Sequence, residues 1–215
     1  MTTAEGWTAA VRDHLAPGRL LPLGAAAERA WITERAVRDV LARGASGVRG
    51  VVPGTLRIGP ADVPDAPDSG AVLVTASFGA VAGRALRELA EALRAALLAA
   101  AEDGLGLVVD AVDLRVTELL DAAPPEPDAG TAPPPGPTSP ATDDPVALAA
   151  LGVTGVAAVT DTLGPPVRRG PDGVRVELAV TAGARPLDVA RAVRTAVTAA
   201  APEGAAVTVV VSDLR

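Results

Sequence analysis

A proline-rich stretch in the middle of the chain divides the sequence into parts that are expected to fold separately. Residues 122–143 contain no Val, Ile, Leu or aromatic side chain, so they cannot bury apolar surface, and their prolines favour extended polyproline conformations. We interpret residues 122–143 as a disordered, semi-stiff linker, with a docking site for a polyproline-binding protein as the alternative. The sequence then divides into an N-terminal arm (1–27), a first unit (28–121), this linker and a second unit (144–215).

Hydrophobic periodicity in the first unit predicts the order helix, strand, strand, helix, strand. Thr33 is expected to cap the first helix and Gly44 to end it, because hydroxyls favour helix starts and glycines favour helix stops. Between them an apolar stripe runs along one side of the helix. Strands are predicted near residues 55–58, 71–78 and 107–117, and the second helix over residues 83–102.

The second unit repeats this order in shorter form. Asp144 as the capping residue, with proline next to it, begins a short helix that Gly152 ends. Strands are predicted near residues 156–162, 174–180 and 207–211, and a helix over residues 186–200. The segment AVLVTASFGAVAGRAL aligns with GVRVELAVTAGARPLD, and the closing strands share V-D-L-R and S-D-L-R. We therefore predict an internal duplication.

These elements predict an α/β fold of the two-layer α+β kind, built from two tandem αββαβ units. In each unit the first two strands should pair antiparallel, and the second and third should pair parallel through a right-handed crossover. Each unit is then a small mixed three-stranded sheet with both helices packed on one face. Its other face and its edges need cover, so we expect packing between units or between chains.

Composition excludes several kinds of chemistry. The chain has no Cys and no Lys, so thiol nucleophiles, thiolate metal sites and Schiff-base lysines are absent. The formal net charge is −7, which disfavours nucleic acid as a partner. His14 is the sole histidine, and no nucleophile motif accompanies it. We predict a chain that is not an enzyme and has no cofactor, no metal and no catalytic residues.

The N-terminus lacks a basic start followed by an apolar run, so no signal peptide is expected. The longest apolar stretch, residues 95–101, is far shorter than the about 20 residues that span a bilayer. We expect a cytoplasmic protein with no direct membrane insertion.

Three further residue groups have ordinary structural interpretations. Gly79 and Gly83 are expected to form a turn, because the spacing of a phosphate-binding loop is missing. Three aspartates in a Pro-rich hairpin loop are expected to be solvated rather than to bind calcium. They are Asp62, Asp65 and Asp68. The carboxylates of the closing strands, Asp110, Asp113 and Asp213, are expected to be exposed without a facing partner.

The candidate partner-binding residues lie in the arm and in one loop of the second unit. Trp31 is expected to anchor the first helix, with partner binding as the alternative. Arg168 and Arg169 form a basic loop tip that could meet the acidic loop of another unit. The apolar residues of the arm are better suited to docking. The full set is Trp7, Leu20, Leu21, Leu23, Trp31, Arg168 and Arg169.

The stretch WITERAVRDVL, residues 31–41, resembles the opening helix of the alkaline-shock/envelope-stress-response family of Gram-positive bacteria. The element order and the Gly-Val pairs after each first helix agree with that family. The stretch GRLLPLG, residues 18–24, resembles a set of uncharacterised actinobacterial proteins associated with it. The resemblance implies a non-enzymatic protein that joins homologous family members and is held beside the membrane by a membrane-anchored partner.

The function expected from the sequence is that of a non-catalytic accessory or structural protein in a membrane-proximal, envelope-stress-type complex. The alternative is a cytoplasmic regulatory module that binds a small ligand between its two units. A deep polar cleft would favour ligand binding, and a flat apolar patch on a helix-free sheet face would favour assembly.

Overall fold

The structure of the chain, a computed structural model, describes residues 17–61, 70–122, 142–171 and 173–215. The chain divides into two compact units, and one of them is assembled from two separate stretches. Met1–Ala36 and Thr138–Arg215 form one, which we call the split unit, and Val37–Pro137 forms the other, which we call the central unit. Residues 123–141 of the predicted linker lie outside the described residues.

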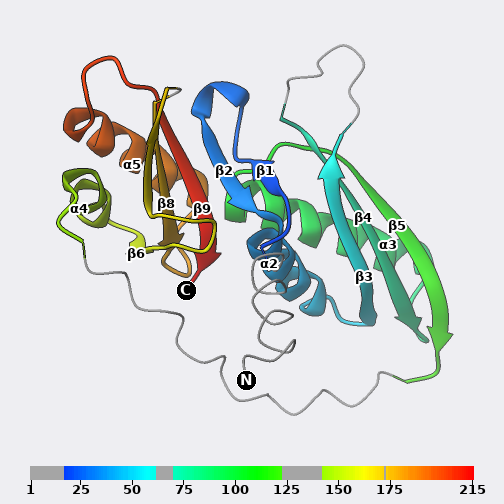
Figure 1. Cartoon of the computed structure of the whole chain (residues 1–215). Helices are drawn as coiled ribbons and strands as arrows, with labels where there is room; N and C mark the ends of the chain where they lie inside the picture. The colour runs from blue at the N-terminus through cyan, green and yellow to red at the C-terminus, as the bar shows by residue number, and fades with distance from the viewer. Residues whose placement is uncertain (1–16, 62–69, 123–141, 172) are drawn as a thin grey trace, which may run out of the picture. The chain divides into compact units, whose positions relative to one another are not determined.

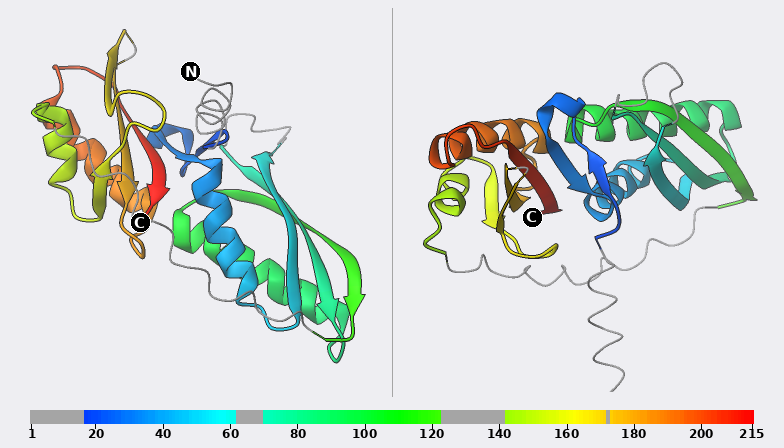
Figure 2. Two further views of the ribbon diagram at one scale, coloured as in Figure 1. Left: turned by 60° about the horizontal axis from the view of Figure 1, so that its bottom comes forward. Right: turned by 45° about the horizontal axis from the view of Figure 1, so that its top comes forward.

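The central unit has the predicted element order. Its sheet runs β3-β4-β5, with β3 antiparallel and β5 parallel to β4. Both helices lie along the same side of this sheet (Figure 2). The mixed three-stranded sheet is therefore confirmed. The elements are α2 (Glu34–Ser46), β3 (Val51–Pro60), β4 (Val72–Val81), α3 (Leu86–Leu98), the π-helical turn η2 (Ala99–Leu105) and β5 (Val109–Leu120).

Alternation over residues 72–78 of β4 builds the core of the central unit. Val74 and Phe78 are buried towards the helices, whereas Thr75 between them is exposed. The predicted helix stop at Gly44 is wrong, because α2 continues to Ser46. A Cβ at Gly44 would lie 3.2 Å from the Cβ of Ala100, so the glycine allows α2 to approach η2 closely.

The split unit contains a larger sheet than the sequence predicted. Six strands take part, in the order β1-β2-β9-β8-β6, and β7 also pairs with β8. Its helices α4 and α5 lie on one side of the sheet (Figure 1). The elements are β1 (Leu20–Pro22), the 3₁₀ turn η1 (Ala26–Glu28), β2 (Ala30–Thr33), α4 (Pro145–Leu151), β6 (Val156–Val159), β7 (Val167–Gly170), β8 (Gly173–Val180), α5 (Pro186–Ala200) and β9 (Val207–Leu214).

The two extra strands come from the N-terminal part of the chain. β2 runs parallel to β9, with Ala30 opposite Val209, and β1 folds back antiparallel on β2. The structure thus differs from the predicted boundary between an arm (1–27) and a first unit (28–121), because β1 and β2 both belong to the sheet of the split unit. The physical reason is that β9 has a second edge, whose backbone groups need partners. β2 pairs with this edge through backbone hydrogen bonds.

Several contacts fix this N-terminal segment to α5. Gly24 has φ of +76°, and a Cβ there would lie 2.9 Å from Leu187, so only glycine fits without strain. The Glu28 carboxylate lies 2.7 Å from the Arg191 guanidinium and 3.4 Å from that of Arg194. These ion pairs lower the pKa of Glu28, chiefly through the Arg191 hydrogen bond.

The strand registers do not support the matching tetrapeptides of the predicted duplication. Asp113 lies opposite Thr75, whereas Asp213 lies opposite Ala179. The sequence alignment placed Thr75 over Glu177 instead. β5 also continues to Leu120, five residues beyond Arg115. The two units share their element order, and the duplication stays a prediction.

Candidate interaction surface

The closing strands of the two units differ in how their edges are paired. β9 pairs with β8 on one edge and with β2 on the other. β5 pairs with β4 on one edge, and no other strand of the described residues pairs with it. Figure 1 shows β5 as the outermost strand of the central sheet. The open edge of β5 therefore carries backbone N–H and C=O groups that another strand could pair.

Apolar side chains are exposed along the same strand. Leu119 is 73% exposed, Val116 is 37% exposed, and Val108 just before the strand is 41% exposed. In β9 the corresponding run is covered: Val209 and Val211 are fully buried. Exposed apolar groups on an unpaired strand are typical of a site where another chain adds a strand. We call residues 108–120 the β5 edge.

The middle of the β5 edge is regular and carries both signs of charge. Pairing with β4 is irregular between Val109 and Ala111 and again between Val116 and Glu118, so residues 111–116 form an undistorted stretch. Asp113 and Arg115 are exposed in this stretch, and Leu114 between them is half-buried.

The helix-free face of the central sheet is polar. Arg57, Thr75 and Asp113 lie side by side across the three strands. The flat apolar patch that would favour assembly is therefore not on this face, and the exposed apolar groups lie on the edge instead.

The split unit buries a carboxylate on its helix-free side. Glu177 in β8 has no exposed side-chain surface. Its oxygens accept hydrogen bonds from the Leu163 backbone N–H at 3.0 and 3.2 Å and from the Thr160 hydroxyl at 3.0 Å. Arg175 lies 3.6 Å away. Burial raises the pKa of Glu177, and these hydrogen bonds together with Arg175 oppose the rise.

This network fixes the connection between β6 and β7. The loop of residues 160–166 interrupts what would be one strand beside β8, and Glu177 holds it through Thr160 and Leu163. The Thr160 hydroxyl also lies 2.6 Å from that of Ser212 in β9. These hydrogen bonds join the loop to β8 and β9 and so stabilise the fold.

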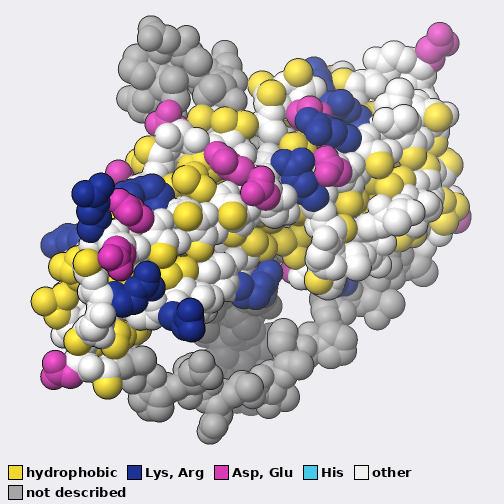
Figure 3. Space-filling view, turned by 180° about the vertical axis from the view of Figure 1, so that it is seen from behind, with side chains coloured by type: hydrophobic (Ala, Val, Ile, Leu, Met, Phe, Trp, Pro, Cys, Tyr) yellow, Lys and Arg dark blue, Asp and Glu magenta, His cyan; other side chains and the backbone are white. Residues whose placement is uncertain are grey.

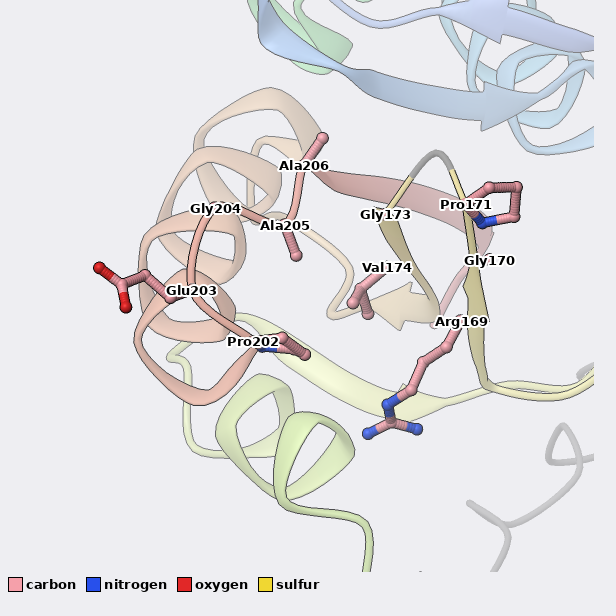
Figure 4. A pocket seen from close by; sticks show the side chains of 10 residues that line it. All are labelled: Arg169, Gly170, Pro171, Gly173, Val174, Pro202, Glu203, Gly204, Ala205 and Ala206. Atoms are coloured by element: carbon pink, nitrogen blue, oxygen red, sulfur yellow. The ribbon is translucent and has the colours of Figure 1, made fainter.

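A shallow cavity of about 420 Å³ lies where the tip of the β7–β8 hairpin meets the connection from α5 to β9. Figure 4 shows that the Arg169 guanidinium points towards α4 and that the Glu203 carboxylate points away from the other lining residues. Ligand sites place a few polar groups so that they converge on the bound molecule. Neither charged side chain does so here, which does not favour a small-ligand site in this cavity.

The apolar residues predicted to bind partners differ in their exposure to solvent. Leu21 and Leu23 are buried, so the structure removes them from the candidate surface, whereas Leu20 stays exposed. Trp31 is not the packing anchor of α2: it is 36% exposed, and its neighbour Ile32 is buried instead. In β2 alternate side chains face opposite sides, which turns Trp31 away from the core. Trp7 and His14 lie outside the described residues.

The two arginines of the predicted basic tip also differ. Arg169 makes two hydrogen bonds, of 2.7 and 2.9 Å, to the Asp144 carboxylate at the start of α4, so it acts within the chain. Arg168 is exposed in β7. The acidic loop proposed as its counterpart, with Asp62, Asp65 and Asp68, lies outside the described residues.

The remaining sequence candidates are carboxylates of the closing strands and two glycines near the end of β4. Asp110 and Asp113 are exposed on β5, as predicted. The prediction is wrong for Asp213, which is half-buried and paired with Arg215 at 3.0 Å. Gly79 is not in a turn but within β4, where a Cβ would lie 3.1 Å from Glu118. Gly83, with φ of +102°, is in the turn that follows.

Charges on the described surface are mixed in sign. Figure 3 shows basic and acidic side chains next to one another on the face in view, and α3 carries the ion pair Arg87–Glu91 at 2.9 Å. In the described part of the chain, no three His, Asp or Glu side chains gather closely enough to hold a metal ion. Within the same ranges, no helix is long and apolar enough to cross a membrane.

Comparison with known proteins adds no relative: no protein-family model, no curated protein and no solved structure matches the chain. The geometry of the β5 edge is therefore the basis for a functional proposal.

Proposed function

We propose that the chain is a non-catalytic accessory protein that acts through protein–protein contacts made at the β5 edge. One observation carries this proposal. β5 and β9 hold the same place in their sheets, since each closes its unit and runs parallel to the strand before it, yet β9 is paired on both edges and β5 on one. Strand addition to an open edge supplies affinity through backbone hydrogen bonds and specificity through side-chain pairs.

Within this proposal the contacts are made in a membrane-proximal complex in the cytoplasm. The resemblance of residues 31–41 to the envelope-stress-response family supports this setting. A membrane-anchored partner would then supply the attachment to the membrane.

The test is affinity purification of the tagged chain from its host in mild detergent. It compares the proteins that co-purify with the wild type and with a variant whose β5 edge is blocked. The blocked variant carries Val116→Lys and Leu119→Lys, because lysines on an edge strand oppose further pairing. The matched control is Leu148→Lys on α4, where an equally apolar side chain is 51% exposed in the other unit.

We expect a bound protein, whether a homologue or another copy of the chain, to be recovered with the wild type and the Leu148→Lys control and to be lost with the edge variant. Recovery of the same proteins by all three would contradict a role for the β5 edge. Recovery of none by the wild type would contradict the proposal as a whole.

A further inference from the structure

We infer that the β5 edge pairs with the β5 edge of a second copy of the chain, in an antiparallel, two-fold symmetric dimer centred on Leu114. The inference rests on the proposed function, because it names the partner of the same edge. Two-fold dimers are the commonest closed assemblies, and in them one surface is complementary to itself.

Self-complementarity follows from the order of residues around Leu114. In an antiparallel pair, residues at equal distances from the centre lie opposite each other. Asp113 of each copy therefore faces Arg115 of the other, which gives two cross-strand ion pairs. Val112 faces Val116, so the exposed valine meets an apolar partner.

The same register also matches the two faces of the sheet. Asp113 and Arg115 lie opposite Thr75 and Ser77 in β4, on the helix-free face. Their ion pairs would stay at the solvent side. Val112 and Val116 lie opposite Val74 and Phe78, which belong to the core. Their contacts would therefore extend the buried layer across the dimer.

The flanks lie outside the regular stretch of residues 111–116. If the register continued through them, their apolar side chains would also meet. Val109 would face Leu119, the most exposed apolar side chain of the edge. Val108 would face Leu120. The unfavourable pair is Asp110 with Glu118, which occurs twice in a two-fold dimer and opposes pairing at both ends of the β5 edge, outside residues 111–116.

Neighbouring registers lack this complementarity. A centre on Asp113 sets Asp113 against itself, and a centre on Arg115 sets Arg115 against itself. Like charges directly opposite each other destabilise a strand pair. Charge therefore selects Leu114 from the three possible centres in the middle of the regular stretch.

A different assembly, in which β2 of one copy pairs with the β5 edge of another, is less favourable than the β5–β5 dimer because it leaves as many edges open. The closing strands β9 and β5 each have one edge beyond the strand that precedes them, and each chain has one β2 that can pair with such an edge. If β2 moved to the β5 edge of another copy, the β9 edge that it left would be open, and the number of open edges would not change. A β5–β5 pair closes two open edges at once.

The experiment is sedimentation equilibrium of the purified full-length chain with charge-changing variants. The wild type should sediment at twice its monomer mass of 21.3 kDa at high concentration. Asp113→Arg and Arg115→Asp should each weaken the dimer at least about tenfold, because like charges then face each other. Mixed in equal amounts, the two variants should form a heterodimer, in which every 113–115 pair again joins opposite charges. The double variant should dimerise as the wild type does.

Formation of the heterodimer also shows that both single variants are folded, because two unfolded chains could not form it. The matched control is Arg57→Asp, a charge change on the same sheet face but on β3 at the opposite edge, and it should leave the dimer unchanged. A monomeric wild type, or a dimer that survives both single charge changes, would overturn the inference. If the wild type is monomeric but still captures an edge-dependent protein from the host, the dimer is wrong and the proposed function stands.

Discussion

The hydroxyl of Thr33 donates a 2.9 Å hydrogen bond to the backbone carbonyl oxygen of Ser212, across 179 positions in the sequence. Thr33 ends β2, Ser212 lies in β9, and both residues are buried. The Ser212 hydroxyl contacts that of Thr160, which in turn bonds to Glu177. One buried chain of hydrogen bonds thus links the N-terminal strand to the loop between β6 and β7.

We expect Thr33→Val to lower the free energy of unfolding by about 1–3 kcal/mol, because it removes a buried hydrogen bond and a helix cap. The cap contact is the 3.4 Å approach of the Ala36 N–H to the same hydroxyl. Urea denaturation measures the change. Thr33→Ser keeps the hydroxyl and loses only the methyl group, so it serves as the control and should cost less. A Thr33→Val variant as stable as the wild type would contradict a role for the hydrogen bond.

Asp144 is expected to contribute more to stability than its partner Arg169. Its carboxylate accepts the Val146 N–H at 2.9 Å and so caps α4, besides bonding to Arg169. Asp144→Ala should cost about 0.5–2 kcal/mol, the usual range for a lost cap. Arg169→Ala should cost less because that pair is partly exposed, and the neighbouring Arg168→Ala should cost nothing measurable. Thermal unfolding of the three variants checks the order, and a loss in Arg168→Ala as large as that in Asp144→Ala would refute it.

The paired carboxylate of Asp144 and the buried carboxylate of Glu177 should make the stability of the fold depend on pH in opposite directions. The hydrogen bond from Arg169 lowers the pKa of Asp144, so the stability that Asp144 contributes is present above its unfolded-state pKa and is lost as pH falls through the lowered folded-state pKa. Burial raises the pKa of Glu177, so its contribution is present below the unfolded-state pKa and is lost as pH rises through the raised folded-state pKa.

Glu177→Gln should therefore remove the part of the stability loss that the wild type shows as pH rises above the ordinary glutamate pKa of about 4.3. Urea unfolding at a series of pH values measures this slope. Glu203→Gln, at an exposed position, is the control for the loss of one charge. An unchanged slope in Glu177→Gln would mean that the buried carboxyl does not titrate in this range.

Gly173→Ala should be strongly destabilising, because Gly173 has φ of +119° and a Cβ there would overlap the backbone oxygen of Ala206. Gly183 also has a positive φ, of +86°, but a Cβ would meet nothing within 4 Å. Gly183→Ala should therefore cost only the backbone strain of about 1–3 kcal/mol. The difference between the two variants in thermal unfolding isolates the steric contact, and equal losses would contradict it.

Elements with local signals could be predicted from the sequence. The helix expected over residues 186–200 is α5 with the same bounds, because its apolar stripe and its proline at the first position act within a few residues. The cap of α4 by Asp144 followed for the same reason. The antiparallel and parallel pairings within each unit also agree with the prediction, since short connections and helical crossovers restrict them.

Contacts between distant parts of the chain could not be predicted in this way. The pairing of β2 with β9 joins residues that no local pattern relates, so Trp31 was assigned to the helix entry and not to a strand. Glu177 lies in the alternating sequence of β8, where local periodicity alone would place it on the polar side. It is buried because the loop of residues 160–166 folds over it. The open edge of β5 depends on strand order, which periodicity does not determine.

The split arrangement of the chain also has a consequence for the order in which it can fold during synthesis. Thr33 is translated 179 residues before Ser212, which corresponds to roughly 10–40 s at ordinary elongation rates of about 5–20 residues per second. In that interval the central unit has all of its strands, whereas β1 and β2 have no β9 to pair with. The nascent chain must therefore keep the apolar strand β2 unpaired after the central unit has been synthesised. We expect chaperones to bind the chain in this interval.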